Sequence, residues 1–161
     1  MLRKQIIPPS SPPPSPGQPD AKDIAAVATV LVTSEAPDHP VEHLFDGRDG
    51  RGGTRWTASS EGEQTLVLAF DAPQSVREVS LETEEPHASR TQVLTLSLSQ
   101  DGGRTYREVL RQEFTFSPPG TTFERERWSV RADGVTHLRV VIRPDKGDGP
   151  GRATLTSLAV R

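Results

Sequence analysis

The sequence contains no cysteine among its 161 residues. A chain without thiols cannot form a disulfide framework, bind zinc through thiolates or use a cysteine nucleophile. Asparagine is also absent, so the chain has no acceptor for N-linked glycosylation. These absences remove whole classes of site, but they leave the cellular compartment open.

Long apolar runs are missing as well. The apolar run at residues 25–32 is about half the length that a membrane span requires. A secretory signal needs about 7 to 15 consecutive apolar residues, and here only Ile6 and Ile7 precede a proline-rich stretch. We therefore expect no membrane span, no signal peptide and, if Met1 is the native start, a cytoplasmic protein.

The sequence also has no excess of positive charge. The net charge is −3 and the pI is about 5.8, so no global positive field gathers nucleic acid, and we expect no nucleic-acid partner. Apolar residues make up only 32% of the chain, which predicts a small core. The length fits a single domain.

Proline is plentiful at the start of the chain. Residues 8–19 carry seven of the 15 prolines, which predicts an extended, polyproline-like arm without a packed core. We expect residues 1–22 to form a disordered, Pro-rich flexible arm, serving as a spacer or as a ligand for a proline-recognising groove. The folded binding domain is then expected over residues 23–161.

Short runs of alternating apolar and polar residues, separated by turn residues, occupy most of the remaining chain. Such runs at roughly 8 to 12 residue spacing predict an all-β, antiparallel jelly-roll β-sandwich of about eight strands. One helical turn is expected at residues 41–45. The expected strands cover residues 25–32, 66–70, 76–81, 93–98, 106–116, 123–130, 138–142 and 153–160.

Residues 44–56 carry the densest pattern, with two carboxylates, Asp46 and Asp49, four glycines and the hydroxyl of Thr54. Glycine adopts positive φ without steric cost, so such a loop can turn carbonyl oxygens toward a small centre. Calcium prefers such all-oxygen sites. Gly and Asp are equally typical of ordinary turns, so both a calcium site and a plain structural loop remain open. We expect Trp56, at the end of the loop, to lie in the core.

A second turn, Ser99 to Tyr106, has the spacing Ser-x-Asp-x-Gly-x-Thr-aromatic. Asp-Gly between alternating runs is a strong hairpin signal, and the spacing resembles the Asp-box hairpin. In that motif the aspartate, here Asp101, caps its own turn. We interpret it as a stabilising element without a catalytic role.

Five fragments in order carry a resemblance to a known family. They are Leu44-Phe-Asp-Gly with Thr54-Arg-Trp, Leu66 to Pro73, Arg90 to Gly102, Val135 to Val140, and Leu155 to Val160. Together they resemble a discoidin domain, also called the coagulation factor type C domain, of the galactose-binding-like fold, which is similar to bacterial carbohydrate-binding modules. The resemblance runs from about residue 33 to residue 161 and implies a jelly roll.

The resemblance also implies site residues. It suggests a structural Ca2+ held by Asp46 and Thr54. Ser157 stands where many members place an acidic ligand, so Asp49 is the candidate replacement. Carried over by position, the ligand-binding candidates are His87 and Arg90, after an acidic run, and Trp128. The alternative is that Arg90 is an ordinary surface charge and Trp128 a core residue.

An enzymatic role finds little support in the sequence. The four histidines show no HExxH spacing, and no Gly-x-Ser-x-Gly elbow is present. Glu82, Glu84 and Glu85 supply carboxylates, but such a charged group usually forms a solvated face. We therefore expect a non-catalytic protein.

Two functions remain. The first is a glycan-binding module that uses loops at one end of the sandwich. The second is an intracellular adaptor that binds a partner protein through the same loops or a sheet face. The lack of asparagine and the eight aromatic residues count against the glycan. The missing signal and the proline arm favour the partner protein.

Overall fold

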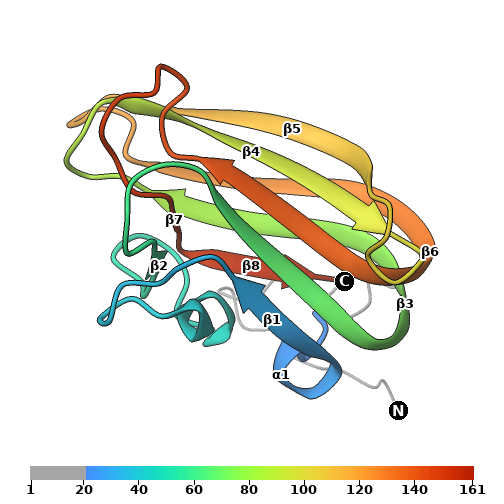
Figure 1. Ribbon diagram of the computed structural model, residues 1–161. Coiled ribbons are helices and arrows are strands. Elements are labelled where there is room, and N and C mark those ends of the chain that lie inside the picture. Colours follow the sequence, from blue (N-terminus) through green and yellow to red (C-terminus); the bar gives the residue numbers. More distant parts are fainter. Residues whose placement is uncertain (1–20) are drawn as a thin grey trace, which may run out of the picture.

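The computed structural model describes residues 21–161 of the chain, so the arm predicted for residues 1–22 lies outside the described residues apart from its last two. In chain order the elements are helix α1 (Ile24–Val27), strand β1 (Ala28–Val32), 3-10 helix η1 (Val41–Phe45), and strands β2 (Trp56–Thr57), β3 (Gln64–Glu84), β4 (Arg90–Ser99), β5 (Arg107–Phe116), β6 (Phe123–Arg143), β7 (Thr154–Leu155) and β8 (Ser157–Val160) (Figure 1). The all-β sandwich and its strand number agree with the prediction.

The first half of β3 shows why these strands form. Gln64, Leu66, Leu68 and Phe70 are buried, while the residues between them are partly exposed. An extended chain places successive side chains on opposite faces, so this alternation turns one face toward the core. The burial gained on that face stabilises the strand.

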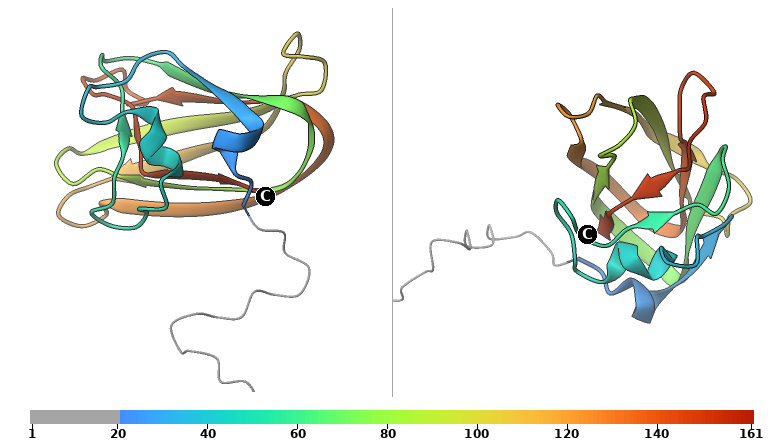
Figure 2. Two further views of the ribbon diagram at one scale, coloured as in Figure 1. Left: turned by 90° about the horizontal axis from the view of Figure 1, so that it is seen from below. Right: turned by 90° about the vertical axis from the view of Figure 1, so that its left-hand side faces the viewer.

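Two long bent strands connect the layers of the sandwich. The first half of β3 pairs with β1 and with residues 137–142 of β6, and β4 and β5 continue that sheet. The second half of β3 pairs with residues 123–135 of β6 and with β8. In Figure 1 both long strands bend at the same, right-hand side of the molecule, and Figure 2 shows the layers from two further directions.

The bends correct the predicted strand boundaries. We expected separate strands at residues 66–70 and 76–81, and again at 123–130 and 138–142, but each pair is one continuous strand. Register shifts between Ala69 and Glu78 let β3 turn without leaving the ladder, as β-bulges do. The predicted strand at residues 25–32 begins instead with α1, whereas the predicted turn at residues 41–45 is η1.

Trp56 lies in the core with no exposed surface, which confirms its predicted position. Its Nε1–H donates to the carbonyl of Ser34 at 3.0 Å, so the polar edge of the indole is satisfied where it is buried. The other large, fully buried side chains include Leu66, Leu81, Leu94, Phe114, Phe116, Leu138, Ile142 and Leu155.

Several of the connections between strands gather at the left-hand end of Figure 1, which the right-hand view of Figure 2 faces, whereas the turn between β4 and β5 lies at the opposite end. Backbone hydrogen bonds join them, from Glu85 N to Thr122 O at 2.8 Å and from Ala58 N to Ala153 O at 2.9 Å. We call this the loop end; it comprises residues 58–63, 85–89, 117–122 and 144–153. Among the described residues, no helix is long and apolar enough to cross a membrane.

Candidate functional site

Arg90, the first residue of β4, is bonded to two connections of the loop end. Only 5% of its side chain is exposed, and its Nε donates to Glu85 Oε1 at 2.9 Å. Its Nη1 donates to the carbonyls of Pro144 and Arg152 at 3.0 and 2.9 Å. These bonds hold two loops to the start of β4. Arg90, predicted to bind a ligand, is therefore a buried residue that links these loops to the sheet.

The other two predicted ligand-binding residues have different surroundings. His87 is exposed in the loop after β3. Trp128 is half-buried in β6, opposite Val79, and packs against the core. Of the three candidates, His87 is therefore the one that lies on an exposed loop of the loop end.

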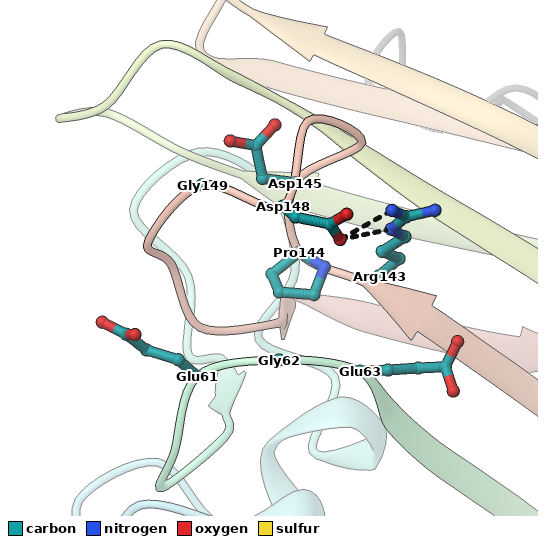
Figure 3. A pocket seen from close by; sticks show the side chains of 8 residues that line it. All are labelled: Glu61, Gly62, Glu63, Arg143, Pro144, Asp145, Asp148 and Gly149. Carbon is teal, nitrogen blue, oxygen red and sulfur yellow. Dashed lines mark hydrogen bonds and ion pairs between the residues drawn. The ribbon is translucent and has the colours of Figure 1, made fainter.

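A hollow of about 540 Å3 opens between the turn that precedes β3 and the loop that follows β6 (Figure 3). We call it the loop-end pocket. Sequence reasoning missed it, because its residues look like two unrelated polar turns until the topology brings them together. The lining residues are Glu61, Gly62, Glu63, Arg143, Pro144, Asp145, Asp148 and Gly149.

One ion pair organises the pocket. Asp148 Oδ1 accepts hydrogen bonds from Arg143 Nη2 at 2.6 Å and Nε at 3.1 Å (Figure 3). The hydrogen bond and the charge of Asp148 raise the pKa of Arg143, so its guanidinium stays protonated. Asp145 Oδ1 accepts from Gly147 N at 3.2 Å, and a side chain on Gly149 would overlap the second oxygen of Asp145. These contacts fix the loop's shape.

The loop of residues 46–54, predicted as a calcium site, lies against the outer face of the second half of β3. Gly50 N donates to Glu82 Oε2 at 2.6 Å, and Gly52 N donates to Glu84 Oε1 at 3.2 Å. Both glutamates are buried, at 5% and 8% exposure, which corrects the expectation of a solvated face. A buried carboxylate is costly without partners, and these backbone N–H groups supply them.

Each of the two buried glutamates also forms an ion pair with an arginine. Glu82 pairs with Arg125 at 2.7 Å, and Glu84 pairs with Arg55 at 2.9 Å. Because Arg55 directly follows the same loop, Glu84 holds that loop both through the backbone amide of Gly52 and through the Arg55 side chain.

Oxygen atoms converge around Thr54, which bears on the predicted calcium site. Thr54 Oγ1 lies 2.5 Å from Asp46 Oδ2 and 3.5 Å from the carbonyl oxygens of His43 and Arg48. One hydroxyl donates a single hydrogen bond, so other oxygens of the group keep acceptor capacity. An all-oxygen donor set with a carboxylate is the chemistry that calcium accepts, and these residues fit it.

Little negative charge surrounds this group of oxygen atoms. Partial burial raises the pKa of Asp46, but hydrogen bonds from Thr54 and Arg48 and the charges of His43 and Arg48 outweigh it and lower the pKa overall. Asp49 lines a separate depression together with Glu82 and Ser157. No group of three acidic or histidine side chains converges as metal ligands within the described part of the chain.

Similar proteins are found among solved structures. No family model matches the sequence, and no curated protein matches it. A family 32 carbohydrate-binding module of AlyQ, solved with 4,5-unsaturated mannuronic acid, is 20% identical over 84% of this chain and 95% of its own, with a TM-score of 0.59.

Two further solved structures are similar. A family 32 module from Clostridium perfringens, in complex with GalNAc-β-1,3-galactose, is 19% identical over 88% of this chain and 99% of its own, with a TM-score of 0.57. A chitosan-binding module from a Paenibacillus chitosanase/glucanase is 21% identical over 83% and 94%, with a TM-score of 0.54. The chain therefore has the galactose-binding-like, discoidin-type fold, as its sequence predicts.

Proposed function

We propose that this protein is a non-catalytic carbohydrate-binding module that holds its ligand in the loop-end pocket. The observation that carries the proposal is the pocket itself, a polar hollow between two loops, on a fold whose solved neighbours are named as sugar-binding modules. Loops carried by a rigid sandwich are a common location for binding sites.

The residues of the pocket suit sugar hydroxyls. The carboxylates of Glu61 and Asp145 stand on the two loops that border the hollow (Figure 3), and each can accept hydrogen bonds from hydroxyl groups. The Arg143 guanidinium can donate to ring or hydroxyl oxygens, and its two hydrogen bonds to Asp148 Oδ1 fix its direction. Pro144 provides a buried, apolar part of the lining for the C–H face of a sugar ring.

We also propose that the loop of residues 46–54 binds Ca2+ through Asp46, Thr54 and the carbonyls of His43 and Arg48. Asp49 is proposed to add charge from the same loop. When bound, the ion would neutralise Asp46 and stabilise the loop without taking part in any reaction. His87, exposed at the loop end, is proposed as an additional ligand contact.

Calorimetric titration of the folded chain with neutral, cationic and anionic oligosaccharides tests the carbohydrate proposal. We expect binding by the wild type and a loss of about tenfold in affinity for Arg143→Gln, since a lost charge-assisted hydrogen bond corresponds to about 1.4 kcal/mol or more. Glu108→Gln, an exposed change on β5, is the matched control and should bind like the wild type.

A different result would overturn the proposal. If none of the oligosaccharides binds while the wild type is folded, the pocket is not a carbohydrate site. A protein partner that binds the wild type but not Arg143→Gln would then favour the adaptor function that the sequence left open.

A further inference from the structure

One buried side chain, that of Arg90, is bonded to both ends of the loop that forms one side of the loop-end pocket. Its Nη1 donates to Pro144 O at 3.0 Å, where the loop begins, and to Arg152 O at 2.9 Å, where the loop ends. Three of the residues that line the pocket lie between these two carbonyls (Figure 3). A single nitrogen atom therefore holds both ends of this loop.

The second side of the pocket is joined to the same place. Arg152 is followed by Ala153, whose carbonyl accepts a hydrogen bond from Ala58 N at 2.9 Å. Ala58 begins the turn whose residues 61–63 line the pocket. Because Arg90 holds Arg152, its position also affects how far apart the two sides of the pocket lie.

The guanidinium of Arg90 has little freedom to move. Only 5% of the side chain is exposed, and its Nε donates to Glu85 Oε1 at 2.9 Å. The backbone N–H of Glu85 donates in turn to Thr122 O at 2.8 Å. A Cβ on Gly151 would lie only 3.1 Å from Nη1 of Arg90, so the loop packs closely against the guanidinium. A lysine has one nitrogen atom in place of this planar group and cannot make all three bonds.

The shape of the loops affects binding even where a residue does not contact the ligand. Arg90 is not among the residues that line the pocket. Loops that become ordered only when a ligand binds reduce the affinity, because their ordering costs conformational entropy. A residue that holds the loops in place beforehand avoids that cost.

We propose, on the basis of the carbohydrate-binding function proposed above, that Arg90 is a positioning residue. Its bonds to Pro144 and Arg152 hold the loop-end pocket in the shape that binds the ligand, and they thereby set the affinity. This role differs from the direct ligand contact that the sequence predicts for Arg90.

Calorimetric titration with three hexasaccharides tests this role: neutral cellohexaose, the cationic hexamer of glucosamine and an anionic hexamer of galacturonate. For each hexamer that the wild type binds, we expect Arg90→Lys to reduce the affinity by about tenfold. The lysine keeps the positive charge beside Glu85, so the loss measures the bonds to the two carbonyls.

Amide hydrogen exchange, followed by NMR without any ligand, measures the hold on the loop directly. Lys146 N donates to Thr91 O at 2.7 Å, and Asp148 N donates to Asp145 O at 3.0 Å. We expect both amides to exchange faster in Arg90→Lys, because opening of the loop exposes them to water. The amides that join β1 to β3 should keep their exchange rates.

Val76→Ala is the control for a general loss of stability. Val76 has no exposed surface and lies in the bend of β3, so its truncation leaves a cavity and lowers the melting temperature. It should leave both the affinity and the exchange of the loop unchanged. If Arg90→Lys loses no more affinity than Val76→Ala does, Arg90 contributes to stability alone and the proposed role is wrong.

Gly151→Ala tests the same contact with the arginine retained, and it decides the matter if Arg90→Lys does not fold. The added methyl group crowds Nη1, so we expect a smaller loss of affinity and faster exchange of the loop. Wild-type affinity or wild-type loop exchange in the folded variants would overturn the role of Arg90 and leave a carbohydrate-binding module. If the wild type binds none of the hexamers, the proposed function itself is overturned.

Discussion

Asp101 shows what a single side chain contributes to this fold. In the turn between β4 and β5 its carboxylate accepts hydrogen bonds from Thr105 Oγ1 at 2.5 Å, Ser99 Oγ at 2.7 Å, Thr105 N at 3.0 Å and Arg104 N at 3.1 Å. These bonds, those from Thr105 foremost, lower the pKa of Asp101 from 3.8 to about 2. The predicted capping of the turn by its own aspartate is thereby confirmed.

We expect Asp101→Asn to lower the melting temperature at neutral pH, because the amide accepts these hydrogen bonds less strongly than the carboxylate. The pKa is lower in the folded than in the unfolded state, so the stabilisation is complete above the unfolded value near 3.8 and is lost as the pH falls through about 2. Thermal unfolding from pH 7 downward should show the gap between wild type and variant closing over that range. A gap that stays constant down to pH 2 would assign the loss to packing, and Glu108→Gln serves as the control.

The residues that sequence could and could not place differ in the range of their contacts. Trp56 and Asp101 were predictable because a loop-closing tryptophan and a Ser-x-Asp-x-Gly-x-Thr turn carry local signals. Glu82 and Arg90 were not predictable, because their burial depends on partners distant in sequence, Gly50 for one and Arg152 for the other. No local pattern distinguishes such residues from ordinary surface charges.

At the scale of elements, the loop of residues 46–54 has two kinds of support: the carboxylates of Glu82 and Glu84 hold its backbone, and Asp46 closes onto Thr54. We expect millimolar Ca2+ to raise the melting temperature of the wild type, by about 3 °C for each 1 kcal/mol of linked binding energy. Differential scanning fluorimetry with Ca2+ against chelator measures the shift.

Two variants locate the ion. Asp46→Asn should abolish the Ca2+-dependent shift, since it removes the carboxylate next to Thr54. Asp49→Asn should reduce the shift if Asp49 supplies the second charge, and it is otherwise a matched control from the same loop. If Ca2+ leaves the wild type unchanged, the loop is held by hydrogen bonds alone.

The boundaries of elements were harder to predict than their existence. The alternating runs identified almost every strand, because half-burial imposes a period of two on the sequence. The continuity of β3 through residues 71–75 was missed, because Asp71-Ala-Pro-Gln has the composition of a turn. A register shift absorbs those residues within the strand, and a bulge of this kind depends on the neighbouring strand.

At the scale of the whole fold, strands β3 and β6 connect the two layers of the sandwich, since each passes from one layer to the other. Neither layer can therefore lose its pairing without disturbing the other, and we expect residues 23–161 to unfold as a single cooperative unit. Both tryptophans lie outside the layer formed by β1, the first half of β3, residues 137–142 of β6, β4 and β5, because Trp56 is in β2 and Trp128 is in the first half of β6. Their fluorescence thus reports on one part of the sandwich, whereas far-UV circular dichroism reports on all of it.

Urea unfolding followed by both signals tests this expectation. The two midpoints should coincide, and Leu138→Ala, in the part of β6 that pairs with β4, should shift both equally. Leu138 has no exposed surface, so its truncation should lower the free energy of unfolding by about 2–5 kcal/mol. Leu31→Ala is the control, because Leu31 is 52% exposed and its loss should change stability by less than about 0.5 kcal/mol. If Leu138→Ala moves the dichroism transition and leaves the fluorescence transition in place, the layers unfold separately and the bent strands do not couple them.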